Sequence, residues 1–255
     1  MARRLRRSAP AALLAILALP GAAPAADTLY AVSKDDRLIT INSSVPANLE
    51  RAVRILGLPQ GERVLAIDVR PENDTLMGVT TSSRIVELNP VTGLARPVGR
   101  QVPFSPALSG GSFGFDFNPT VDRIRLVSDA DQNLRIGPNT GLTTFRDDRL
   151  AYAPGDPSAR TNPAVGASAY SNSVAGATTT TLFGIDSGRD TLVRQDPPND
   201  GVLNTVGRLG VDAVEPVAFD ITPAGVGYAS FRRAGQKGTE LFSVSLAGGR
   251  ARGTA

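Results

Sequence analysis

Short runs in which apolar and polar residues alternate recur along this chain, and they recur in a fixed order. The clearest group consists of residues 113–119, 123–127 and 133–136. Alternation with period two is typical of half-buried β-strands. After residue 25, no segment has convincing helical periodicity. The pattern therefore predicts an all-β protein.

The groups of runs repeat about every 46 residues. An apolar residue in the second run of each group marks the repeat, with successive copies 47, 48, 58 and 44 residues apart. These copies are Leu29, Leu76, Ile124, Leu182 and Val226. Units of this length with four short antiparallel strands are typical of propeller blades, whereas solenoid repeats are usually shorter and need caps. We predict a β-propeller of five blades, with six as the alternative if the one long insertion hides strands.

Turns with proline and glycine follow the third run of the repeat. Residues 89–93 and 137–141 are the clearest cases, since Pro fixes φ at the first turn position and Gly accepts a positive φ. The first unit lacks its opening strand. The last unit ends soon after its third strand, and residues 246–255 lack such a turn. Closing the ring would therefore need a strand shared between the two termini, or an incomplete blade.

One segment, from about residue 150 to residue 180, breaks the repeat. It is rich in Pro, Gly, Asn and Ser, and it contains a degenerate copy of the first strand that runs through Tyr170. We expect a long loop before that strand. Because long loops in compact domains are usually functional or mobile, this insertion is the candidate binding face. Its candidate contact residues are Tyr152, Asp156 and Tyr170.

Residues 1–25 have the form of a secretory signal. Four arginines precede an apolar run from Ala9 to Leu19, and Ala23 and Ala25 supply a cleavage site with small residues. The apolar run is shorter than the roughly 20 residues that span a bilayer. We therefore expect an exported protein, periplasmic or extracellular. Its mature part, residues 26–255, would be a single domain without a membrane anchor.

Removing the signal changes the charge of the chain. The full sequence has 27 basic and 24 acidic residues, and four of the basic residues belong to the signal. The mature chain therefore carries a net charge of −1 instead of +3, with the two signs interspersed. A nucleic-acid surface needs a basic patch or stripe, so we expect no nucleic-acid partner.

The chain contains no cysteine and no histidine. Disulfides and cysteine-ligated metals are therefore excluded. The missing histidine removes the commonest general base and transition-metal ligand, together with the usual Ser–His–Asp and Cys–His arrangements. Paired carboxylates for glycoside hydrolysis stay open, but 24 acidic residues give many chance pairs. No catalytic set is visible.

Three aspartates, Asp68, Asp116 and Asp220, occupy one position of the first strand, three residues before a proline. Tyr170 takes this position in the fourth copy. If that strand is the innermost one, the carboxylates lie around the channel and offer oxygen ligands to a hard cation such as calcium. Alternatively, each aspartate accepts backbone N–H groups in the turn before its proline. We favour this structural interpretation, because a structural device recurs wherever the unit recurs.

A second candidate for calcium is the set Asp129, Asp131 and Asn133, whose spacing matches the first half of a calcium loop. Leu134 stands where such a loop needs Gly, and Thr140 stands where it needs Glu. A hairpin turn rich in Asp and Asn is the preferred interpretation.

Three arginines form a basic group in neighbouring runs. They are Arg123, Arg125 and Arg135. Arginine binds carboxylates and phosphates bidentately, so an anionic ligand is one hypothesis. Ion pairing within the chain is the preferred one. The aspartates near in sequence are Asp116, Asp122 and Asp129.

Several longer motifs give a family resemblance. They span residues 112–125, 131–135, 151–156, 169–173 and 180–186. Through these motifs the chain resembles the DUF4394 domain family, a bacterial family of unknown function, over essentially the whole mature sequence. The resemblance implies an exported, propeller-like β domain. It carries over no catalytic residue.

Full-length repetition without a visible catalytic set favours a non-enzymatic binding or scaffold protein. Its loops on one face would bind an extracytoplasmic small molecule or protein, with no certain cofactor. The alternative is a hydrolase or lyase that acts on extracellular carbohydrate or lactone at the channel mouth. That alternative would use Asp116 together with a calcium ion.

Overall fold

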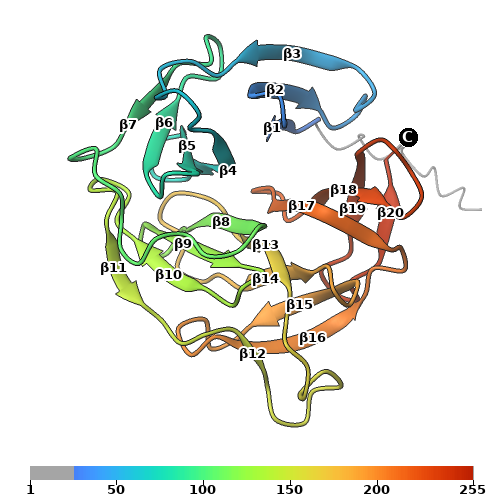
Figure 1. Cartoon of the computed structure of the whole chain (residues 1–255). Coiled ribbons are helices and arrows are strands. Elements are labelled where there is room, and N and C mark those ends of the chain that lie inside the picture. Colours follow the sequence, from blue (N-terminus) through green and yellow to red (C-terminus); the bar gives the residue numbers. More distant parts are fainter. Residues whose placement is uncertain (1–25, 255) are drawn as a thin grey trace, which may run out of the picture.

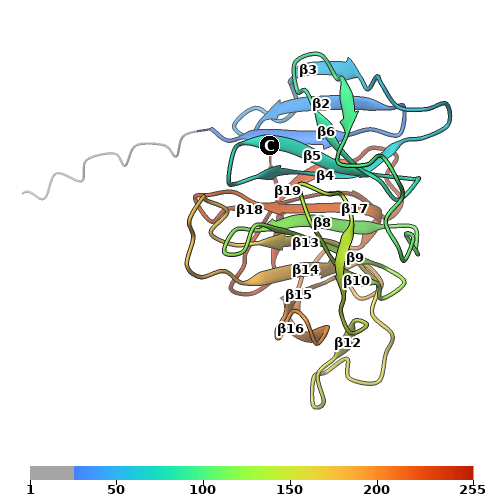
Figure 2. The same ribbon diagram turned by 90° about the vertical axis from the view of Figure 1, so that its left-hand side faces the viewer.

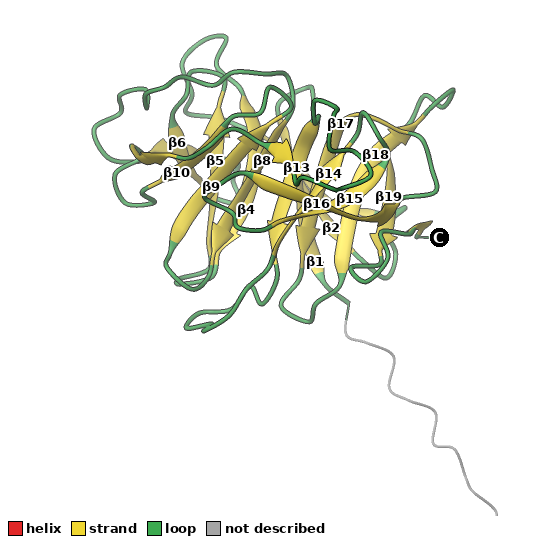
Figure 3. Cartoon of the chain, turned by 90° about the horizontal axis from the view of Figure 1, so that it is seen from below, coloured by secondary structure: helices red, strands yellow, loops and turns green. Residues whose placement is uncertain are grey.

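The computed structural model describes residues 26–254, which form five small antiparallel sheets arranged in a ring (Figure 1). The prediction of a five-bladed β-propeller is confirmed. Strands and loops make up the described part, and no helix occurs within it (Figure 3). Accordingly, no helix there is long and apolar enough to cross a membrane. The expected signal, residues 1–25, lies outside the described residues.

Each blade is a continuous stretch of sequence, and in blades one, two, three and five the strands pair in chain order. Blade one comprises β1 (Thr28–Val32), β2 (Arg37–Asn42) and β3 (Leu49–Arg54). Blade two comprises β4 (Val64–Arg70), β5 (Thr75–Thr80), β6 (Ile85–Leu88) and β7 (Ala95–Pro97). Blade three comprises β8 (Phe113–Asn118), β9 (Arg123–Ser128), β10 (Asn133–Ile136) and β11 (Thr143–Arg146).

Blades four and five complete the ring. Blade four comprises β12 (Ala151–Tyr152), β13 (Val165–Tyr170), β14 (Leu182–Asp186), β15 (Thr191–Gln195) and β16 (Val202–Arg208). Blade five comprises β17 (Ala213–Ile221), β18 (Gly227–Arg233), β19 (Glu240–Val244) and β20 (Ala251–Gly253). The side view shows β8, β13 and β17 lying along one common direction (Figure 2). Together with β4 they are the innermost strands of blades two to five, and they bring the same repeat position to the centre of the ring (Figure 1).

The hydrophobic core is divided among the contacts between neighbouring blades. Phe115 and Phe117, on β8, pack with Met77 and Val79 of blade two. The two phenylalanine rings meet edge to face, with centroids 6.2 Å apart. Further clusters join blades one and two, three and four, and four and five. Each blade is therefore stabilised by the apolar contacts that it makes with neighbouring blades.

Blade one has three strands, since β1 pairs with β2 and no opening strand precedes it among the described residues. The expected incomplete blade is therefore present. Blade five, by contrast, is complete, because β20 pairs with β19. The prediction that the last unit ends after its third strand was wrong. Tyr228 of blade five donates a hydrogen bond to the Asp27 carboxylate beside blade one, at 3.4 Å.

A turn without proline explains this difference. The Ser245 N–H donates to the Arg250 carbonyl and the Gly249 N–H donates to the Ser245 carbonyl, at 3.0 and 2.7 Å. The turn at Asn89–Gly93 makes the same two bonds between equivalent positions. Gly249 has φ 77° and Gly93 has φ 73°. Glycine at the last position thus suffices for the turn, and proline is dispensable.

The insertion at about 150–180 is more ordered than the loop expected from the sequence. Its β12 pairs in parallel with β16, with Ala151 opposite Val202 and Tyr152 opposite Leu203. This adds a fifth strand to the outer edge of blade four. The strand hidden in the insertion therefore extends an existing blade, and the six-bladed alternative is wrong.

Candidate functional site

Three carboxylates meet at the centre of the ring. Asp68 on β4, Asp116 on β8 and Asp220 on β17 each place one oxygen within 4.8 Å of the others. Asp68 and Asp116 are 8% and 3% exposed, whereas Asp220 keeps contact with solvent. The structure thus brings together the three aspartates that share a repeat position.

Backbone N–H groups hold the three carboxylates in place. Asp68 Oδ2 accepts a hydrogen bond from Phe117 N at 2.8 Å, and Asp116 Oδ1 accepts one from Tyr170 N at 2.9 Å. Asp220 Oδ1 accepts from Ile221 N at 2.6 Å. Phe117 and Tyr170 belong to the next blade, whereas Val69 N, which donates to Asp68 Oδ1 at 2.6 Å, belongs to the same strand as Asp68. Asp68 and Asp116 therefore link neighbouring blades, whereas Asp220 bonds only within its own strand. Within residues 26–254 the second oxygens of Asp116 and Asp220 accept no hydrogen bond.

The environment disfavours the charged form of all three groups. Burial raises the pKa of Asp68 well above its usual range, and the charge of Asp220 adds to this shift. Burial also raises the pKa of Asp116 well above its usual range, with further contributions from Asp68 and Asp220. The pKa of Asp220 is raised by burial among the inner strands, although its side chain contacts solvent. Within the described part of the chain, none of the three forms an ion pair with Arg or Lys.

In the fourth copy of the repeat, the position equivalent to the three aspartates lies one residue earlier in the sequence than predicted. Tyr170 N donates to Asp116 as Phe117 N donates to Asp68, so Tyr170 corresponds to Phe117. Ala169 therefore holds the aspartate position in blade four, and placing Tyr170 there was wrong. The β8 and β13 backbones are also very close, since a Cβ on Gly114 would lie 2.5 Å from Ser168 N. Glycine is required at this contact.

Two of the three candidate arginines pair with a carboxylate that was not among the expected partners. Arg125 Nη1 donates to Asp147 Oδ2 at 2.6 Å, and Arg135 donates to both oxygens of Asp147 at 2.8 Å. Asp122, one of the expected partners, pairs with Arg70 of blade two instead. Asp147 follows β11 and is distant from Arg125 in sequence, so strand alternation gave no signal for it. Internal pairing is therefore confirmed for Arg125 and Arg135, with a different partner. It is not found for Arg123, which within residues 26–254 donates only to backbone carbonyls.

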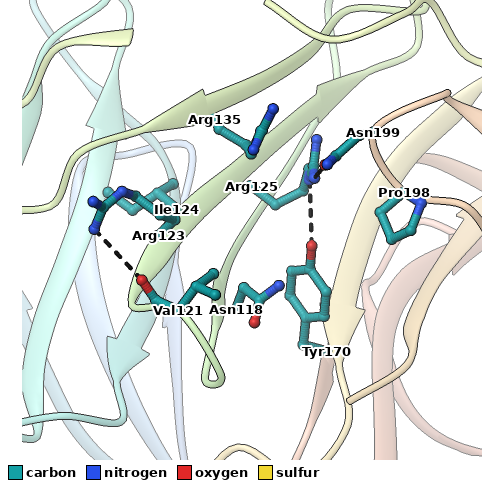
Figure 4. A pocket seen from close by; sticks show the side chains of 9 residues that line it. All are labelled: Asn118, Val121, Arg123, Ile124, Arg125, Arg135, Tyr170, Pro198 and Asn199. Atoms are coloured by element: carbon teal, nitrogen blue, oxygen red, sulfur yellow. Dashed lines mark hydrogen bonds between the residues drawn. The ribbon is translucent and has the colours of Figure 1, made fainter. Parts of the chain in front are cut away.

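A cavity of ≈ 220 Å³ lies beside this ion pair, between blades three and four (Figure 4). Arg125 links the two blades, because its Nε donates to the Tyr170 hydroxyl at 3.3 Å and its Nη2 donates to Asn199 Oδ1 at 2.8 Å. Asn118 and Pro198 lie close to these side chains in the same wall. The Arg123 guanidinium points away, toward the Val121 carbonyl.

Comparison with known families identifies the chain. The model of the DUF4394 family, a domain of unknown function, matches residues 37–255. The chain belongs to the DUF4394 family. No curated protein matches it.

One similar solved structure is PorZ, described as an essential bacterial surface component of the type-IX secretion system of Porphyromonas gingivalis. It shares 12% sequence identity with this DUF4394 domain, with a TM-score of 0.43. The match covers 89% of this chain but only 26% of the PorZ chain. The domain thus spans about a quarter of that protein's length.

The second calcium candidate of the DUF4394 domain does not converge on a common point. Asp129 Oδ1 accepts from Gly111 N at 2.8 Å, whereas Asp131 Oδ2 pairs with Arg149 at 2.9 Å. Asn133 Oδ1 accepts from Arg125 at 2.7 Å. These three oxygens therefore each have a partner of their own. The hydrogen bonds therefore favour the hairpin turn over a calcium loop.

Two of the three expected loop contacts in the DUF4394 domain are buried. Tyr152 is 6% exposed and donates to Asp186 Oδ2 at 2.5 Å, and Tyr170 is 1% exposed. Placing them on a loop was wrong, because both lie in strands, Tyr152 in β12 and Tyr170 in β13. Tyr170 nevertheless lines the cavity between blades three and four. Asp156 accepts from Ser158 N, from Thr205 N and from the Thr205 hydroxyl. It therefore ties the insertion to β16.

Asp156→Asn is expected to lower the free energy of unfolding at pH 7 by about 1–2 kcal/mol, since charge-assisted hydrogen bonds are lost. Although burial opposes it, hydrogen bonding from Thr205 and Ser158 lowers the pKa of Asp156. A lowered folded-state pKa gives stability that is complete above the unfolded pKa of about 3.9 and is lost as the pH falls through the folded value. The difference between wild type and variant should therefore be constant from pH 7 to about pH 5, then shrink below about pH 4.

Urea unfolding at several pH values measures this difference. Asp200→Asn, on an exposed turn of the same blade, is the control and should stay within about 0.5 kcal/mol of wild type. A difference for Asp156→Asn that grows as the pH falls would contradict the prediction.

Proposed function

We propose that this DUF4394 domain is an exported binding protein whose central channel holds a divalent cation. The carboxylate oxygens that would bind the cation favour calcium. The observation that carries the proposal is the meeting of three carboxylates from blades two, three and five within 4.8 Å. Calcium takes six to eight oxygen ligands in flexible geometry. Asp68, Asp116 and Asp220 would supply three of them, and water reaching the exposed Asp220 side would supply others.

A bound cation would also solve an electrostatic problem of the fold. Three carboxylates at this spacing repel one another, and burial strengthens the repulsion. A divalent ion would replace this repulsion by attraction and would join three blades that are separated in sequence. Blade one lacks the corresponding strand, so the ion would strengthen the ring where the repeat is incomplete.

Export is the second part of the proposal, and it rests on the form of residues 1–25. Extracellular calcium modules bind the ion with dissociation constants of about 10⁻⁴–10⁻³ M. We expect a site made of three carboxylates to bind calcium with a dissociation constant in that range. The ligand of the binding protein would be an extracytoplasmic small molecule or protein.

The enzymatic alternative uses the same residues differently. A hydrolase or lyase would need one aspartate free to act on a carbohydrate or lactone at the channel mouth. Asp68 and Asp116 are instead committed to backbone N–H groups of the neighbouring blade. Each of these two carboxylates thus already holds a contact between blades, and this structural role favours binding over catalysis.

Thermal melting of residues 26–255, first with EDTA and then with increasing calcium, tests the cation. When the calcium concentration is 100 times the dissociation constant, binding to the native state raises the free energy of unfolding by about 2.7 kcal/mol. We therefore expect a saturable rise in Tm of roughly 5–10 °C. Magnesium, which prefers rigid octahedral geometry and keeps its water, should raise Tm less. Identical melting with EDTA and with saturating calcium would refute the cation site.

A further inference from the structure

The pocket between blades three and four is lined by hydrogen-bond donors that the described residues leave unused. Arg125 has five N–H groups, and four of them donate to Tyr170, Asn133, Asp147 and Asn199. One N–H on Nη2 therefore stays unpaired. The Tyr170 hydroxyl accepts from Arg125, but within residues 26–254 its own hydrogen has no acceptor.

The asparagine side chains of the pocket add further donors. Asn118 Oδ1 accepts from the N–H and the hydroxyl of Thr120, and Asn199 Oδ1 accepts from Arg125. Their amide nitrogens make no hydrogen bond to the described part of the chain. Arg125 and Tyr170 are only 2% and 1% exposed, so their polar atoms are buried side-chain groups that border the cavity. A ligand for this pocket must therefore supply acceptors.

The charge of the pocket is positive by at least one unit. Arg125 and Arg135 share the single carboxylate of Asp147. Asp122, between the lining residues Val121 and Arg123, is paired with Arg70. Arg123 adds a further positive charge at the exposed rim. One excess charge at the buried centre suits a monoanion such as a carboxylate better than a doubly charged phosphate.

We propose that this pocket binds the carboxylate of a small hydroxy acid of the uronic acid type. Arg125 and Tyr170 donate to the carboxylate, and the amides of Asn118 and Asn199 donate to the hydroxyl groups. The cavity of ≈ 220 Å³ is below the roughly 300–1,000 Å³ of typical small-molecule sites, so it takes one sugar unit or one end of a chain. This site does not rest on the channel cation, because its charge is of the opposite sign and its side chains are different.

Calorimetric titration of residues 26–255 with D-glucuronate, in EDTA, tests the pocket separately from the channel. We expect saturable binding of glucuronate and no binding of neutral glucose. Tyr170→Phe removes one donor and keeps the ring, so it should raise Kd about tenfold, which corresponds to about 1.4 kcal/mol. Asn199→Ala, on an exposed turn, is a second variant for the same pocket and should raise Kd several-fold.

Tyr152→Phe is the matched control. It also removes a buried hydroxyl from blade four, but that hydroxyl donates to Asp186 and lies outside the pocket. Its Kd should stay within about twofold of wild type. The proposal fails if glucuronate gives no saturable heat, or if sulfate binds as tightly as glucuronate. It also fails if Tyr152→Phe weakens binding as much as Tyr170→Phe.

Discussion

Asp147→Ala is expected to lower the free energy of unfolding by about 3–5 kcal/mol, because it leaves a buried charge without its partner. The Arg125 side chain is 2% exposed and Asp147 is 6% exposed, so solvent cannot replace the lost carboxylate. Arg125 would keep its neutral partners Asn133, Tyr170 and Asn199, but none of these carries a charge. Arg135 would lose both of its hydrogen bonds to the same carboxylate.

Urea unfolding of the variant, followed by circular dichroism, measures the loss. The control is Asp196→Ala, since the Arg194–Asp196 pair is about half exposed, at 49% and 57%, with a distance of 3.5 Å. Exposed ion pairs contribute about 0–1 kcal/mol, so this variant should remain close to wild type. If both substitutions lower the free energy of unfolding equally, burial of the Arg125–Asp147 pair does not increase its contribution to stability, and the prediction is wrong.

The architecture was predictable because each repeat carries its own local signals. Strand alternation and the turn at Asn89–Gly93 fixed the blade boundaries, and spacing of about 46 residues indicated five blades. The last blade was misread because its turn, closed by Gly249, contains no proline. The two residues of β12 were missed because a strand so short has no periodicity of its own.

The candidate site was predictable only where it follows the repeat. Asp68, Asp116 and Asp220 share one strand position, and closing the ring brings that position to the centre. Tyr170 was misplaced by one residue because the fourth copy has no proline to align with. Asp147 was missed for another reason: its contact with Arg125 depends on how β11 leaves blade three, and such packing has no sequence signature.

Asp116→Asn is expected to abolish most of the calcium-dependent rise in Tm while leaving the fold intact. Asparagine has nearly the same shape as aspartate and keeps one oxygen that can accept from Tyr170 N. Without calcium, the variant should be as stable as wild type or more stable, because one of three repelling carboxylates is gone. With calcium at a concentration that gives wild type about 2.7 kcal/mol, the variant should gain less than about 1 kcal/mol, since the ion loses a charged ligand.

Asp129→Asn separates this effect from a general loss of acidic charge. Asp129 is also partly buried and accepts a backbone N–H, from Gly111, but its carboxylate is not part of the central group. Its calcium response should therefore equal that of wild type, measured by melting at several calcium concentrations. If Asp116→Asn keeps the full response, calcium binds elsewhere and the central carboxylates serve only to link the blades. If both variants lose it equally, the response comes from diffuse surface charge, because an ion held by Asp68, Asp116 and Asp220 would be insensitive to Asp129.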